Sequence, residues 1–238
     1  MPADSWADNG GVRVHYLDSA TDAHRVQVPI LFIPGMLGVA EDYVTEMDYL
    51  APRRSVGVSL RGRGKSDAPE TGYSFENHVA DIEAVVARSS LGRFGLMGYS
   101  VGGAYALGFA IRNPDQVRGI IVGDYPATYP KFPARWAERA LELAGDRTKP
   151  HVPPGLQADS TRISLWEHLE VLRCPLLLIR GGRRGSLLTS YGVRRYRHHM
   201  PQAETVVFRE SGHELWVPDR ERYLRTLKDF LERLDVSA

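Results

Sequence analysis

The sequence contains a single cysteine, Cys174, among 238 residues, so no disulfide can form within the chain. No apolar run approaches the roughly 18 residues that a membrane-spanning helix needs. The first residues, Met-Pro-Ala-Asp-Ser-Trp, carry neither the basic nor the apolar segment of a secretory signal. We therefore expect a soluble, cytoplasmic protein that has no disulfide, and we expect Cys174 to be a buried structural residue.

An excess of charge of either sign is also missing. Lysine and arginine total 30 and aspartate and glutamate 29, giving a formal net charge of +1. This balance argues against a nucleic-acid partner or an anionic membrane surface. The hydrophobic fraction of 43% and the charged fraction of 25% are close to globular averages. The length suits a single domain over residues 1–238, and the oligomeric state stays open.

Short apolar runs alternate with amphipathic stretches, which is typical of a mostly parallel, doubly wound α/β sheet. The predicted buried strands are Pro29 to Ile33, Ser55 to Ser59, Arg93 to Met97, Val117 to Val122, Pro175 to Ile179 and Glu204 to Phe208. An additional antiparallel strand is predicted over Gly11 to Leu17, where apolar and polar residues alternate. Helices are predicted at about 75–90, 101–113, 188–199 and 219–234.

One region, residues 126–160, breaks this alternation. It contains six prolines around a single predicted helical piece, Ala134 to Ala144. Prolines remove backbone donors and interrupt regular elements. We interpret this region as a small lid inserted after a strand, within the same domain.

A candidate nucleophile lies between a predicted strand and a predicted helix. Gly98-Tyr99-Ser100-Val101-Gly102 has the form G-x-S-x-G, which in this context is typical of a sharp turn that exposes a catalytic serine. Flanking glycines remove side chains that would collide in such a turn. We therefore predict Ser100 as the nucleophile.

A serine hydroxyl needs a neighbouring base to take its proton. Among eight histidines, His213 lies directly after the last predicted strand and before the C-terminal helix. Loops at the carboxyl ends of parallel strands gather at one edge of a sheet, so His213 can meet Ser100 there. His198 and His199 fall in a basic helical stretch and are expected to be solvated.

With these residues, the chain resembles the α/β-hydrolase superfamily over nearly its whole length, as a serine-nucleophile, esterase-like member with a small lid. Three other segments carry the resemblance: Phe32 to Met36 for the oxyanion loop, Ser59 to Ser66 for a segment that usually begins with Asp, and Ser211 to His213 for the histidine loop. The resemblance implies the backbone N–H groups of Met36 and Val101 as an oxyanion hole.

The usual position for the acid of the family, after the strand ending at Ile179, is empty, because residues 180–187 contain no carboxylate. A second position known in the family follows the preceding strand, where Asp124 stands. We predict that Asp124 orients His213. A Ser–His dyad, or an acid from Asp219 or Glu210, remains an alternative.

Neither a cofactor nor a metal ion is expected. Residues 63–66 resemble the end of a phosphate-binding loop, but Ser59 stands where that motif needs glycine and no helix follows. His198 and His199 lack further ligands at metal-binding spacing.

The leading functional hypothesis is hydrolysis of a carboxylic ester of a small acyl substrate through an acyl-enzyme. C–C bond, lactone and thioester hydrolysis and cofactor-free perhydrolysis remain open on the same fold. Arg183 and Arg184, at the expected site edge, suggest an acidic substrate. A catalytically weak small-molecule receptor is the alternative from a different class, favoured only by the missing usual acid.

Overall fold

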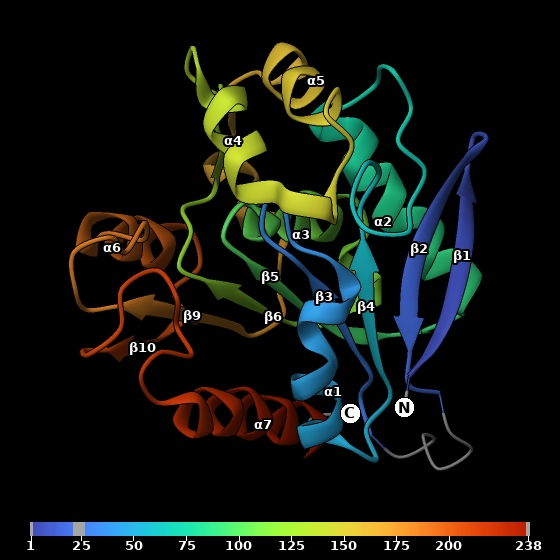
Figure 1. Cartoon of the computed structure of the whole chain (residues 1–238). Coiled ribbons are helices and arrows are strands. Elements are labelled where there is room, and N and C mark those ends of the chain that lie inside the picture. Colours follow the sequence, from blue (N-terminus) through green and yellow to red (C-terminus); the bar gives the residue numbers. More distant parts are fainter. Residues whose placement is uncertain (1, 21–26, 237–238) are drawn as a thin grey trace.

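The computed structural model describes residues 2–20 and 27–236, which form a twisted sheet of eight strands flanked by helices (Figure 1). The strand order is β1-β2-β4-β3-β5-β6-β9-β10. The bounds are β1 Ala3–Asn9, β2 Val12–Asp18, β3 Ile30–Ile33, β4 Ser55–Ser59, β5 Phe94–Tyr99, β6 Val117–Gly123, β9 Leu176–Gly181 and β10 Glu204–Phe208.

The six strands from β4 to β10 are parallel, and β1 and β2 complete the sheet as an antiparallel edge. The predicted α/β class with a mostly parallel, doubly wound sheet is confirmed. Each of the six buried strands forms within two residues of its predicted bounds. The edge strand β1 was not predicted, because its sequence, ADSWADN, has too few apolar residues to signal a buried face.

Helices cover both faces of the sheet (Figure 1). On one face, α2 (Phe75–Ser89), α3 (Val101–Arg112) and α6 (Ser190–His199) pack against alternate strand residues such as Leu96 and Val122. On the other, α1 (Val44–Leu50) and α7 (Arg220–Val236) pack against the intervening ones, such as Met97 and Ile121. This alternation leaves few polar positions inside the strands, so each run of buried residues reads as continuously apolar.

Above the carboxyl ends of the parallel strands lie α4 (Trp136–Ala144) and α5 (Val152–Asp159) (Figure 1). Two short strands, β7 (Thr128–Tyr129) and β8 (Ile163–Ser164), pair as a separate antiparallel sheet at the start and the end of this segment. The helix α4 starts two residues after the predicted start. The helix α5 was not predicted, because Pro153 and Pro154 read as breakers. Both prolines occupy the first turn of α5, where the missing N–H has no intrahelical acceptor to lose.

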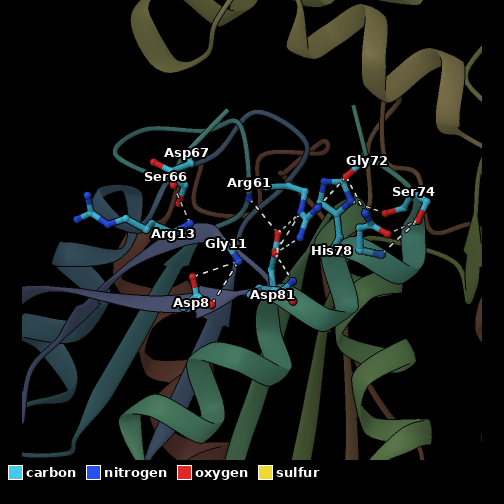
Figure 2. Close-up of polar contacts among 12 residues, drawn as sticks. Asp8, Gly11, Arg13, Arg61, Ser66, Asp67, Gly72, Ser74, His78 and Asp81 are labelled. Atoms are coloured by element: carbon cyan, nitrogen blue, oxygen red, sulfur yellow. Dashed lines mark hydrogen bonds and ion pairs between the residues drawn. The ribbon is translucent and has the colours of Figure 1, made fainter. Parts of the chain in front are cut away.

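A buried ion pair joins the loop after β4 to α2 (Figure 2). The Arg61 guanidinium donates to the Asp81 carboxylate at 2.7 and 2.9 Å, and both side chains are buried. Asn9 of the edge strand donates to the same carboxylate at 2.8 Å. The carboxylate that holds Arg61 therefore comes from α2 and also contacts the edge strand.

A second set of contacts ties the loop 59–66 to β2. The Ser66 hydroxyl accepts from the backbone N–H of His15 at 2.7 Å and donates to the backbone carbonyl of Ser59 at 2.5 Å.

Cys174 is only partly buried, although we expected it to be buried. Burial nevertheless raises the pKa of its thiol to about 11, so the reactive thiolate is scarce at neutral pH. Within residues 2–20 and 27–236, no helix is both long and apolar enough to cross a membrane.

Removal of the Asp81 charge leaves Arg61 buried without its counter-ion. We expect Asp81→Asn to lower the free energy of unfolding by about 3 kcal/mol, measured by urea denaturation. The control is Glu221→Gln, which breaks an exposed pair with Arg225 on α7 and should change stability by less than about 0.5 kcal/mol. Equal effects of the two substitutions would contradict this assignment.

Candidate active site

Ser100 lies at the turn between β5 and α3, with backbone angles of φ 53° and ψ −136°. Few non-glycine residues adopt a positive φ, and such strain is typical of functional turns. Backbone carbonyls lie so close to the turn that no side chain fits at the glycines on either side of it. A Cβ on Gly98 would lie 2.3 Å from the Gly102 carbonyl oxygen, and one on Gly102 would lie 2.3 Å from the Pro34 oxygen. The two glycines are therefore required for this turn to form.

His213 meets Ser100 across the carboxyl edge of the sheet. Its Nε2 lies 3.0 Å from the Ser100 Oγ, and its Nδ1 lies 2.8 Å from the Asp124 Oδ2. If Nδ1 carries the proton, it donates to the carboxylate and leaves Nε2 free to accept the Ser100 proton. The histidine side chain is 29% exposed, whereas the Asp124 side chain is fully buried.

Asp124 directly follows β6 and has a φ of 52°, a conformation that aspartate tolerates better than most residues. Its carboxylate accepts hydrogen bonds from the loop after β9: from the Ser186 hydroxyl at 2.5 Å, the Leu187 N–H at 2.9 Å and the Leu188 N–H at 3.2 Å. The loop that lacks the usual acid thus supplies donors that hold the acid contributed by β6.

The alternative acids do not approach His213. Glu210 pairs with Arg183, and Asp219 accepts from the Arg222 N–H at 2.9 Å at the start of α7. Neither Arg183 nor Arg184 lines the cavity at Ser100. The expectation that these two arginines attract an acidic substrate stays a prediction, and the pairing of Arg183 with Glu210 does not favour it.

Tyr99 positions His213, a role that the sequence analysis missed. Its hydroxyl donates to the His213 carbonyl at 3.0 Å, and its ring stacks on the imidazole with centroids 5.0 Å apart. Burial raises the pKa of the Tyr99 hydroxyl, so the group remains a neutral donor. Tyr99 fills a variable position of G-x-S-x-G, and the motif alone gives it no signal.

The predicted oxyanion donors lie on both sides of Ser100. Val101 is the first residue of α3, so its N–H has no acceptor within the helix. Met36 follows Gly35, where a Cβ would lie only 3.3 Å from the Ser100 Cβ. No acceptor for the Met36 N–H is found in the part of the chain that the structure describes.

Comparison with known proteins supports the fold. The sequence profile of the alpha/beta hydrolase fold matches residues 28–122, which include the Pro34 loop and the turn at Ser100. The chain has the α/β-hydrolase fold.

Relatives of this α/β hydrolase cover almost its full length. It is 22% identical to an N-formylmaleamate deformylase from Pseudomonas putida, over 93% of this chain and 94% of that protein. Two solved esterases share the fold at 18% identity and a TM-score of 0.79. One, from Exiguobacterium antarcticum, aligns over 97% of this chain and 100% of its own, and the other, from Rhodococcus sp. ECU1013, over 98% and 99%.

A cavity of about 650 Å³ opens at Ser100 in this hydrolase. Its wall is mainly apolar and aromatic, with Met36, Leu37, Tyr43, Tyr99, Leu143, Trp216 and Tyr223. It also contains two acid–arginine pairs, Asp42 with Arg147 at 2.8 Å and Glu46 with Arg220 at 3.4 Å. These dimensions suit a small substrate.

Glu46 is a buried carboxyl group in this wall. The residue is 3% exposed, and its Oε2 has no hydrogen-bond partner among the described residues. Burial is the main reason that the pKa of this carboxyl is raised above its ordinary value.

Among the described residues, Asp4, His15 and Glu41 at the edge of the sheet bring together atoms that could bind a metal ion. The Lys65 ammonium already lies 2.5 Å from Asp4 and 3.3 Å from Glu41. A cation of the protein thus balances these carboxylates.

The raised pKa of Glu46 predicts a pH-dependent stability. Above the ordinary pKa of about 4.3 for glutamate, the folded state keeps a proton that the unfolded state has lost, so the stability from this group falls as pH rises through the folded pKa. Glu46→Gln cannot lose this proton. We expect urea denaturation to give a difference in unfolding free energy, variant minus wild type, that increases from pH 4 to pH 7. A difference that is constant with pH would contradict the assignment.

Proposed function

We propose that this α/β hydrolase cleaves a carboxylic ester of a small acyl substrate through an acyl-enzyme, with Ser100, His213 and Asp124 as its catalytic residues. The observation that carries the proposal is the unbroken path of hydrogen bonds from the Ser100 hydroxyl through His213 to the buried Asp124 carboxylate. Each contact is short enough for proton transfer or for orientation of the imidazole.

In the first half-reaction, the Ser100 Oγ attacks the ester carbonyl carbon while His213 Nε2 takes the hydroxyl proton. The Met36 and Val101 N–H groups donate to the oxygen that becomes negative. Collapse of the tetrahedral intermediate expels the alcohol, which receives the proton from His213. Water then attacks the acyl-enzyme by the same sequence, which releases the acid and restores Ser100.

The position of Asp124 argues against the alternative that this protein is a catalytically weak receptor. That alternative depended on the empty usual position after β9, and Asp124 supplies a carboxylate at 2.8 Å from His213. A binding protein has no need for a strained serine within reach of an oriented imidazole.

A second candidate is hydrolysis of an N-formyl or related amide. It is favoured by the deformylase from Pseudomonas putida, which aligns over 93% of this chain. The same attack by Ser100 applies, but His213 must protonate an amine as it leaves, which is a more demanding step than the release of an alcohol.

Residues 126–160 serve as the lid in this proposal. Leu143 of α4 is 80% exposed and lines the cavity at Ser100, and Arg147 joins the same segment to Asp42. An apolar side chain that is mostly exposed in the free enzyme suits contact with a bound acyl chain.

Hydrolysis of p-nitrophenyl acetate tests the catalytic assignment. We expect Ser100→Ala and Asp124→Asn each to lower kcat by about 10³-fold or more, since both disable the same unit. Asp219→Asn and Glu210→Gln, at the two alternative acids, should stay within about twofold of wild type. Near-normal turnover by Asp124→Asn, with the alternative acids essential, would exclude Asp124 as the acid. N-formylmaleamate in place of the ester tests the second candidate.

The lid assignment predicts a chain-length effect. Leu143→Ser should raise KM for p-nitrophenyl octanoate by about three- to tenfold, the cost of about 1 kcal/mol of lost apolar contact, and should leave KM for the acetate unchanged. Leu141→Ser, on the same helix but outside the cavity, is the matched control. Equal effects of the two variants on the octanoate would argue against a lid role for Leu143.

A further inference from the structure

The catalytic residues do not use Arg63, although its charged side chain is completely enclosed beside the site. Arg63 is 1% exposed and makes no ion pair with a carboxylate within residues 2–20 and 27–236. A buried guanidinium without a counter-ion is costly, and such groups are rare unless they have a function. Its neighbour Arg61, two residues earlier in the same loop, has Asp81 as its counter-ion.

Neutral acceptors hold the Arg63 side chain. Its Nη1 donates to the Arg61 carbonyl and to the His78 Nε2, both at 2.6 Å. The Nδ1 of His78 donates to the Ser74 carbonyl at 2.6 Å, so Nε2 is free to accept. Burial, together with the Arg63 charge, lowers the pKa of His78 well below its ordinary value, so the imidazole stays neutral. His78 therefore accepts from Arg63 as a neutral group and adds no charge beside the guanidinium.

The other nitrogens of the guanidinium, Nε and Nη2, both contact Met36. Nε donates to the Met36 carbonyl oxygen at 2.9 Å, and Nη2 lies 3.6 Å from the Met36 sulfur. Two contacts from one planar group fix both the backbone and the side chain of Met36. Met36 is the residue whose N–H is proposed to bind the oxyanion, next to Gly35 and Ser100.

The loop that carries Arg63 is itself anchored to the lid segment. The Gly64 N–H donates to the Arg147 carbonyl at 2.8 Å, and the Thr148 hydroxyl donates to the Gly62 carbonyl at 2.5 Å. The guanidinium therefore projects from a backbone that is held on both sides, which limits its freedom to move away from Met36.

We propose that Arg63 is the positioning residue of the oxyanion hole. Its guanidinium sets the orientation of Met36, so that the Met36 N–H faces the substrate oxygen. The positive charge of Arg63, which has no carboxylate in an ion pair among the described residues, also favours the oxyanion. The inference rests on the proposed function, because it assigns a role within the same acyl transfer. It does not require Arg63 to touch the substrate.

The test compares two identical substitutions at neighbouring buried arginines, Arg63→Lys and Arg61→Lys. Lysine keeps the charge but lacks the planar fork that reaches both groups of Met36. With p-nitrophenyl acetate, and with rates normalised to active sites titrated by a fluorophosphonate, we expect Arg63→Lys to lower kcat by about 10²-fold with KM within about threefold, similar to loss of one oxyanion donor. Arg61→Lys should keep the wild-type kcat per active site.

A second readout separates positioning from general damage to the fold. A trifluoromethyl ketone adds to the serine as a tetrahedral oxyanion, so its Ki should rise in Arg63→Lys by the same factor as kcat falls. Binding of the carboxylate product should not change. Arg63→Gln serves as a second variant if the lysine variant does not fold, with the same expected pattern.

Wild-type kcat and Ki in the Arg63 variants would overturn the inference and leave the proposed function intact. Equal losses in the Arg63 and Arg61 variants, or a Ki that does not follow kcat, would reduce Arg63 to a structural role and also overturn it. A wild-type enzyme that neither hydrolyses the ester nor binds the ketone would overturn the proposed function, and this inference with it.

Discussion

The reversal of the chain at Ser100 imposes the main constraint on the site. The serine between β5 and α3 can adopt its positive φ only because glycine stands at positions 98 and 102. Gly98 leaves room for the Gly102 carbonyl, and Gly102 leaves room for the Pro34 carbonyl. The same close approach brings the loop after β3, which carries Met36, against the turn. One steric condition therefore fixes both the backbone at Ser100 and the approach of the loop that carries a predicted oxyanion donor.

The position of the acid follows from the parallel sheet. Strands β6 and β9 are neighbours in register, with Gly123 beside Ile179, so a carboxylate after either strand reaches the same space near His213. Here the acid follows β6, and the loop after β9 contributes hydrogen-bond donors in its place. Orientation of the imidazole needs a carboxylate beside the His213 Nδ1. A residue that follows either β6 or β9 can provide this carboxylate.

The sequence predicted those features of the fold and the site that depend on residues close together in the chain. Continuous apolar runs predicted the six parallel strands, and G-x-S-x-G after such a run predicted the turn at Ser100. The sequence could not reveal β1, whose stability comes from pairing with β2, or the stacking of Tyr99 on His213. The enclosure of Arg63 was equally hidden, because its partners, Met36 and His78, come from distant segments and their contacts exist only in the folded chain.

Covalent labelling tests the central claim most directly, because it asks whether Ser100 is an activated nucleophile. Wild-type enzyme would be reacted with a fluorophosphonate, and tryptic peptides would be sequenced by mass spectrometry. The peptide of residues 94–112 contains Ser100 as its only serine. We predict a single adduct on Ser100 that forms far more slowly in His213→Ala. Absence of an adduct, an adduct on another residue, or a labelling rate that does not depend on His213 would contradict it.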